Sequence, residues 1–120
     1  NAGKAVNELS LDEKLEVVDQ LDDAGVVAIS FSGGEPLIHR DFWKVATHAS
    51  QKGFHLSIAT NGTLIDNEVA KKLAELNFGY VEISLDASRP EIHDHFRGVE
   101  GAFDRAVRGI KACVKRGLFV

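Results

Sequence analysis

The stretch FSGGEPLIHRDF, residues Phe31–Phe42, decides how this chain folds. It follows the apolar run VVAIS and precedes apolar residues at helical spacing, so it predicts a turn between a buried strand and a helix. Its glycine pair, Gly33 and Gly34, allows positive φ angles and lets the backbone approach a ligand closely. Glu35 follows this pair directly. The stretch therefore places a carboxylate beside a flexible turn at the end of a strand.

The composition indicates one globular α/β domain or part of one. The chain has 120 residues, of which 44% are hydrophobic and 27% are charged, and its net charge is -4. This balance gives no basic footprint for nucleic acid, and no apolar run approaches the ~20 residues that cross a bilayer. The polar start NAGKAVNELS does not resemble a signal peptide. We therefore expect a cytoplasmic protein without nucleic-acid or membrane partners.

Helices and strands are predicted to alternate along the whole chain, which favours a parallel sheet of βα repeats with right-handed crossovers. The first strand is apolar on both parities, so we expect it to be covered on both faces. A polar loop is expected at 87–101. The residues LFV at 118–120 would begin another strand. Helices are predicted after the caps Ser10, Asp41 and Asp66 and at 102–116, and strands at 26–31, 54–60 and 80–86.

Three strands and a stub make neither a complete doubly wound sheet nor a barrel of eight strands. Both ends of the chain look cut, because the first helix has no preceding strand and the last strand has barely begun. We therefore expect residues 1–120 to be a segment of a larger domain.

Ligands of parallel α/β folds bind beyond the carboxyl ends of the strands, which makes the glycine turn a candidate site. It lacks the lysine of a P-loop and the pattern G-x-G-x-x-G, and Glu35 would repel a phosphate. A carboxylate with nearby carbonyls suits an ammonium group, whose three N–H donors need about three acceptors. From these residues alone, a tight turn with a solvated glutamate stays an open alternative.

The later loops add further polar candidates. Asn61-Gly62 is a common turn dipeptide. Ser84 lies on the polar parity of its strand, which would face either a ligand or solvent at a sheet edge. Arg97 could fork onto a carboxylate or form a surface ion pair with Asp94 or Glu100.

The histidines and the cysteine predict no metal site. His93 and His95 form an H-x-H pair, but in a loop beside a carboxylate this pattern seldom binds a metal. Cys113 is the single cysteine, so the chain can form neither an internal disulfide nor a cysteine-ligated cluster. We expect a buried, inert thiol near an apolar stripe of the last helix, Phe103, Val107, Ile110 and Val114.

Four motifs occur together in the order and spacing found in radical S-adenosylmethionine (radical SAM) enzymes: SGGEPL, ATNGTLI, ISLDAS and HDHFRGVEGAFDRAVRGI. The chain resembles this superfamily from about Ser10 to Val120. It is most similar to the haem-biosynthesis and SPASM-type members, and more distantly to the molybdenum-cofactor cyclase. The resemblance implies the central segment of a radical SAM core domain, with the fold of a partial (β/α)6 TIM-like barrel.

The resemblance also implies roles for individual residues. Gly33, Gly34 and Glu35 would hold the methionine ammonium of S-adenosylmethionine. Other residues would meet the remaining polar groups of S-adenosylmethionine. Arg97 matches an arginine that pairs with the methionine carboxylate in some relatives. These further cofactor-binding positions are Thr60, Asn61, Ser84 and Arg97.

The family chemistry uses a [4Fe–4S] cluster to cleave S-adenosylmethionine reductively to a 5′-deoxyadenosyl radical, which abstracts hydrogen from a substrate. The family holds this cluster with C-x3-C-x2-C, which is absent here. We therefore expect that the cluster loop lies upstream of this chain, that the chain alone binds no cofactor and that it is inactive.

The substrate, a small molecule or a peptide, is not defined by the sequence, and the resemblance implies a reductant such as flavodoxin or ferredoxin. Two other readings stay open. The chain could be a non-catalytic βα binding or regulatory module, or a nucleotide-binding α/β domain.

Overall fold

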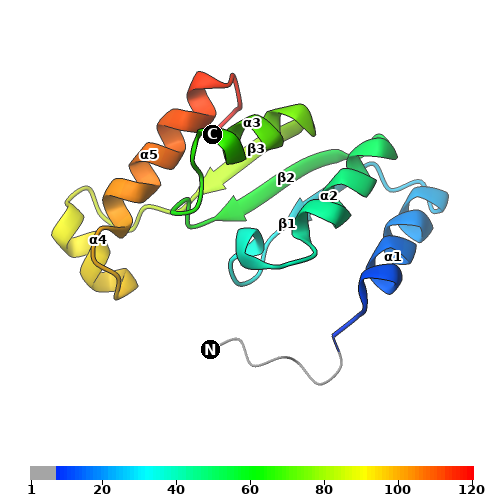
Figure 1. The fold of residues 1–120 in the computed structure, drawn as a ribbon, viewed down its shortest axis with the longest axis horizontal. Helices are drawn as coiled ribbons and strands as arrows, with labels where there is room; N and C mark the ends of the chain where they lie inside the picture. Colours follow the sequence, from blue (N-terminus) through cyan, green and yellow to red (C-terminus); the bar gives the residue numbers. More distant parts are fainter. Residues whose placement is uncertain (1–7) are drawn as a thin grey trace.

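A computed structural model describes residues 8–120 and contains a three-stranded parallel sheet in the order β1-β2-β3 (Figure 1). The α/β class and the parallel sheet predicted from the sequence are confirmed. The strands are β1 (Ala28–Phe31), β2 (His55–Thr60) and β3 (Phe78–Ile83). The helices are α1 (Leu11–Asp23), the 3-10 helix η1 (Pro36–Ile38), α2 (Phe42–Gln51), α3 (Asn67–Glu75), α4 (Pro90–Arg97) and α5 (Ala102–Lys115).

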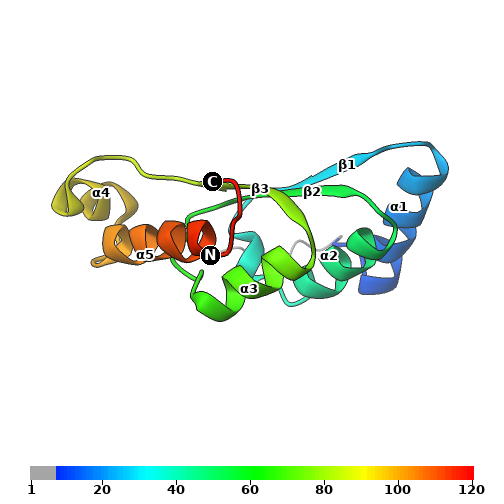
Figure 2. The same cartoon turned by 90° about the horizontal axis from the view of Figure 1, so that it is seen from above.

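The helices α2, α3 and α5 cover one face of the sheet, while among residues 8–120 no helix covers its other face (Figure 2). Strand residues alternate accordingly, since successive side chains point to opposite faces: Leu56 and Ile58 are buried, whereas Ser57 between them is partly exposed. The expectation that the first strand is covered on both faces was wrong, because Ala28 and Ser30 of β1 are exposed. On the open side the exposed strand residues are Ala28, Ser30, His55, Tyr80 and Glu82.

All three predicted helix starts are confirmed, and two of the three residues cap their helix through the side chain. Ser10 and Glu13 form a reciprocal capping box at α1, which satisfies two backbone N–H groups that the helix leaves free. Asp66 caps α3 by accepting from the N–H of Val69 at 2.8 Å. Asp41 stands before α2 but makes no side-chain cap. Its carboxylate instead bonds to Lys14, 3.0 Å away on α1.

The region expected to be a polar loop, 87–101, contains the helix α4, so that expectation was wrong. Pro90 occupies the first turn of α4, where a missing N–H is tolerated, and Gly98 ends the helix with a φ of 69°. Asp94 on α4 accepts from the N–H groups of Gly101 and Phe103, each at 2.7 Å. Because α5 has no side-chain cap of its own at Gly101, Asp94 serves as its cap from another helix.

The third strand begins and ends earlier than predicted, at Phe78 and Ile83, so Ser84 lies just beyond it. The final residues are not assigned to a strand. They nevertheless lie beside β3, because the N–H of Val81 donates to the carbonyl of Phe119 at 2.9 Å, and the rings of Tyr80 and Phe119 lie 5.8 Å apart.

The buried face of α5 consists of small residues. Of the predicted apolar stripe, Phe103, Val107 and Ile110 are partly buried and Val114 is 60% exposed, whereas Cys113 is fully buried, as predicted. Gly109 explains the close approach, since a Cβ there would lie 2.5 Å from the carbonyl oxygen of Gly62. The buried residues of α5 are Ala102, Ala106, Gly109, Ala112 and Cys113.

Candidate functional site

The glycine turn after β1 is exposed at the carboxyl edge of the sheet. Ser32, Gly33 and Gly34 are all exposed, and Gly33 has a φ of 107°, which favours glycine at this position. A Cβ built on either glycine would meet nothing within 4 Å. The turn therefore offers open space beside its backbone, which is where a ligand could approach.

Glu35 joins this turn to the loop after β2. One carboxylate oxygen accepts from the hydroxyl of Thr60 at 2.6 Å and from the N–H of Leu37 at 3.3 Å. The other accepts from the N–H of Asn61 at 2.9 Å. The alternative of a bare turn with a solvated glutamate is therefore wrong, because the carboxylate ties together two loops that lie 25 residues apart.

The loop after β2 is held by the same network. Thr60 is buried, and its hydroxyl accepts from the N–H of Gly62 at 3.1 Å while donating to Glu35. The Asn61 side chain accepts from both the N–H and the hydroxyl of Thr63, at 2.9 and 2.8 Å. These hydrogen bonds orient the loop before any ligand binds.

A cavity of about 520 Å³ adjoins the glycine turn, with Ser32, Gly34 and Glu35 among its lining residues. Besides Glu35, the titratable residues in its wall are Glu8, Lys14, His39 and Asp41. The Nζ of Lys14 lies 3.0 Å from carboxylate oxygens of both Glu8 and Asp41, and His39 also contacts Glu8. This charge cluster ties α1 to the segment between the glycine turn and α2.

Hydrogen bonds set the ionisation of this cluster. Those from Lys14 and then His39 lower the pKa of Glu8 to about 2, and Lys14 also lowers the pKa of Asp41. Desolvation opposes the charge of Lys14, but its bonds to both carboxylates raise its pKa overall. No local sequence pattern predicts this cluster, because its members lie up to 33 residues apart.

The remaining predicted site residues are Ser84 and Arg97. Ser84 lies next to the network, since its N–H donates to the carbonyl of Thr60 at 3.2 Å. Arg97 lies at the end of α4, which extends away from the sheet (Figure 1), and it pairs with Asp86. The predicted ion pair of Arg97 with Asp94 or Glu100 was therefore wrong. Asp86 is the last residue of the predicted third strand, and this position at the carboxyl end of a strand was the sequence signal that could have identified it as a site residue.

His93 and Cys113 have structural surroundings. His93 is 2% exposed, and its Nδ1 accepts from the N–H of Asp86 at 3.0 Å. Burial raises the pKa of the Cys113 thiol. Among residues 8–120, no three His, Cys, Asp or Glu side chains are grouped as metal ligands. The described residues therefore do not fit an iron–sulfur cluster.

The sequence model of the Radical SAM superfamily matches residues 1–120. The chain belongs to this superfamily. It is 48% identical over 114 residues to the Fe-coproporphyrin III synthase of Methanosarcina barkeri, and the match covers 95% of this chain and 28% of that protein. It is 38% identical to the mycofactocin maturase MftC of Mycolicibacterium smegmatis, over 87% of this chain and 26% of that protein.

This radical SAM chain has the same arrangement of helices and strands as a solved structure. It superposes on "native anSMEcpe with bound AdoMet" with a TM-score of 0.76 and 26% identity, over 98% of this chain and 35% of the other. The chain thus spans about a third or less of the proteins it matches. Across residues 8–120, no helix has the length and apolar character needed to cross a membrane.

Proposed function

We propose that the enzyme containing this chain cleaves S-adenosylmethionine reductively, and that this chain supplies part of the S-adenosylmethionine site. The observation that carries this proposal is the Glu35 network, which holds an open glycine turn against Thr60 and Asn61 at the carboxyl edge of the sheet. In a radical SAM chain, this edge is where a cofactor of this size would lie.

The groups of this edge match the polar groups of S-adenosylmethionine. Backbone carbonyls of Gly33 and Gly34 would accept from its ammonium group, and the charge of Glu35 would favour that cation. Because the Glu35 carboxylate already accepts three hydrogen bonds, its main contribution would be to orient the turn. The hydroxyl of Ser84 and the polar groups of Thr60 and Asn61 would meet the cofactor's remaining polar atoms.

Arg97 would bind the methionine carboxylate. It now pairs with Asp86, so binding would require it to share its guanidinium between two carboxylates. A guanidinium has five N–H donors and can do so.

When bound beside a reduced [4Fe–4S] cluster, S-adenosylmethionine supplies a 5′-deoxyadenosyl radical for hydrogen abstraction. The described residues do not fit that cluster, and we assign them no part in electron transfer. Their part is to bind and orient the cofactor. A flavodoxin or ferredoxin would serve as the reductant of the complete enzyme.

The relatives point to two substrate classes. The 48% identity to Fe-coproporphyrin III synthase favours a tetrapyrrole substrate in haem biosynthesis. Peptide modification is the second candidate, favoured by the similarity to a mycofactocin maturase. Incubating the complete enzyme with each class and measuring 5′-deoxyadenosine above the substrate-free level would distinguish them.

The Glu35→Gln substitution tests the cofactor site. A glutamine amide would turn an N–H donor toward the donors of Thr60 or Asn61, and it removes the charge that favours the ammonium. A hydrogen bond to a charged group contributes about 1.5–3 kcal/mol, so we expect about tenfold to a hundredfold weaker S-adenosylmethionine binding. Calorimetry on the anaerobically reconstituted enzyme measures the dissociation constant of S-adenosylmethionine. Glu16→Gln, on the exposed side of α1, is the matched control.

An unchanged dissociation constant in Glu35→Gln would contradict the assigned site. Binding of S-adenosylmethionine without formation of 5′-deoxyadenosine under reducing conditions would instead favour a non-catalytic binding module. The 120-residue chain alone is expected to yield no 5′-deoxyadenosine with dithionite, since one buried thiol cannot anchor a cluster. Its formation would show that the cluster ligands have been misplaced.

A further inference from the structure

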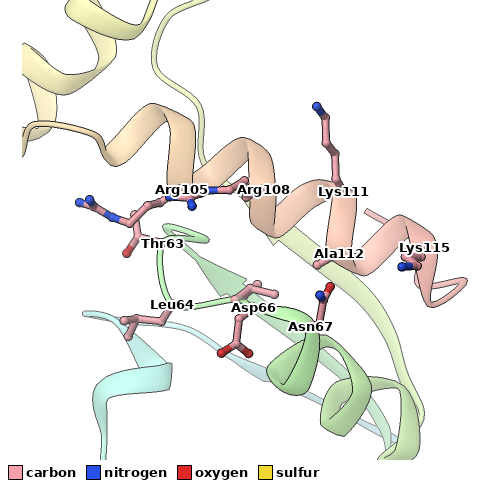
Figure 3. Close-up of a pocket in the computed structure, with 10 residues that line it drawn as sticks. Thr63, Leu64, Asp66, Asn67, Arg105, Arg108, Lys111, Ala112 and Lys115 are labelled. Atoms are coloured by element: carbon pink, nitrogen blue, oxygen red, sulfur yellow. The ribbon is translucent and has the colours of Figure 1, made fainter.

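A second cavity, of about 580 Å³, lies in the helical layer between α5 and the loop that leads into α3 (Figure 3). One wall carries four cationic side chains of α5, and the other carries Thr63, Leu64 and the first residues of α3. Figure 3 shows Arg105 and Arg108 extending over Thr63, whereas Lys111 points away from the loop. The cations of this basic groove are Arg105, Arg108, Lys111 and Lys115.

The basic groove carries more positive than negative charge among the residues that the structure describes. None of its four cations is in an ion pair with a residue of 8–120, although Arg105 donates to the carbonyl of Glu100 at 3.4 Å. The hydrogen bond from the Phe103 N–H, with a smaller effect of Arg105, lowers the pKa of Asp94. The lining carboxylate, Asp66, is already the cap of α3. The whole chain has a net charge of -4, so this concentration of positive charge is local and opposite in sign to the chain as a whole.

The size and spacing of the groove define its ligand. From Arg105 to Lys115 the helix rises about 15 Å, which is too far for one phosphate or carboxylate to reach both ends. The volume is in the range of small-molecule sites, about 300–1,000 Å³. Leu64, 46% exposed, gives the opposite wall an apolar surface.

We propose that the basic groove binds a small molecule carrying two or more phosphate or carboxylate groups. Its anions would pair with Arg105, Arg108 and Lys115, while an apolar part would rest on Leu64. Four cations on one helix in an acidic chain are too few for the extended contacts of a nucleic acid. The groove is separate from the glycine turn but adjoins the same loop, since Thr63 lines it and also bonds to Asn61.

The test measures binding of inorganic tripolyphosphate to the complete enzyme by calorimetry, with orthophosphate as the single-anion comparison. We expect tripolyphosphate to bind at least tenfold more tightly than orthophosphate. The double substitution Arg108→Gln and Lys115→Gln should weaken tripolyphosphate binding at least tenfold. Both side chains are exposed, and circular dichroism would verify that the fold is retained.

The matched control removes the same two charges elsewhere, by Lys44→Gln and Arg116→Gln, at exposed positions outside the groove. It should leave the dissociation constant within twofold of the wild type. An equal loss in the control would show a general charge effect and overturn the proposal. Equal affinity for tripolyphosphate and orthophosphate, or no binding of either, would also overturn the proposal. If polyglutamate alone bound, and lost affinity in the groove variant, the groove would be a protein-docking surface and the proposal would be wrong.

Discussion

Replacing Gly109 by alanine should destabilise the fold, although alanine is the better helix former. At a freely exposed position within a helix, alanine is favoured over glycine by about 1 kcal/mol. At Gly109, however, the new Cβ would lie 2.5 Å from the Gly62 carbonyl oxygen and 3.3 Å from the Ile65 Cβ. The helix or the loop must therefore move before the methyl group fits.

The loop has little freedom to move. Gly62 itself has a φ of 75°, and a Cβ on it would lie 2.6 Å from Ile83, so the loop is enclosed between α5 and β3. Overpacking of this kind costs about 1–3 kcal/mol. After the gain in helix propensity, we expect the free energy of unfolding of Gly109→Ala to fall by up to about 2 kcal/mol.

Urea unfolding followed by circular dichroism measures this change. The neighbouring exposed position gives the reference, since Arg108→Ala should be about 1 kcal/mol more stable than Arg108→Gly. The sign should therefore reverse between positions 108 and 109. If Gly109→Ala were as stable as the wild type or more so, the close contact between α5 and the Gly62 loop would not be a constraint on the fold.

Three further changes test the networks around the candidate site. The carboxyl pKa values of Glu8 and Asp41 are lowered, so their contribution to stability is present above the ordinary carboxyl range and is lost as the pH falls toward 2. The difference in Tm between wild type and Lys14→Gln should therefore shrink from pH 6 to pH 2. A difference that stayed constant over this range would contradict this reasoning. Thr60→Val should lower the free energy of unfolding by about 1–3 kcal/mol, because it leaves buried hydrogen-bonding groups without a partner; equal stability in urea would show that the hydroxyl is dispensable. Asp94→Asn should lower the Tm by weakening the cap of α5. Asp94→Glu should lower it too, and a wild-type Tm in Asp94→Glu would show that the charge alone matters and not the position of the carboxylate.

The sequence predicts the elements of this fold well where local chemistry defines them. The capping box of Ser10 and Glu13 and the alternation of helices with strands were both readable from neighbouring residues. The helix α4 was missed although it carried a signal, since Pro90 suits a first helical turn and Gly98 an end. Its polar composition had suggested a loop.

Contacts between distant residues were beyond reach of the sequence. The motif around Glu35 indicated a ligand site, but nothing local indicates that its carboxylate accepts from Thr60 and Asn61. The pairing of Arg97 with Asp86 depends on how α4 folds back after β3. The open face of β1 was also missed, because an apolar run on both parities predicts two covered faces, whereas alternate residues of β1 are exposed.

The one-sided helical layer divides each strand into two independent sets of residues. Side chains such as Leu56 and Ile58 pack against the helices, so substitutions there change stability. Ser57 and Glu82 alternate with these buried positions and lie on the opposite face of the sheet. Substitution of these two residues therefore leaves the helix–sheet packing of residues 8–120 in place and changes instead the surface that the strands present on their other side.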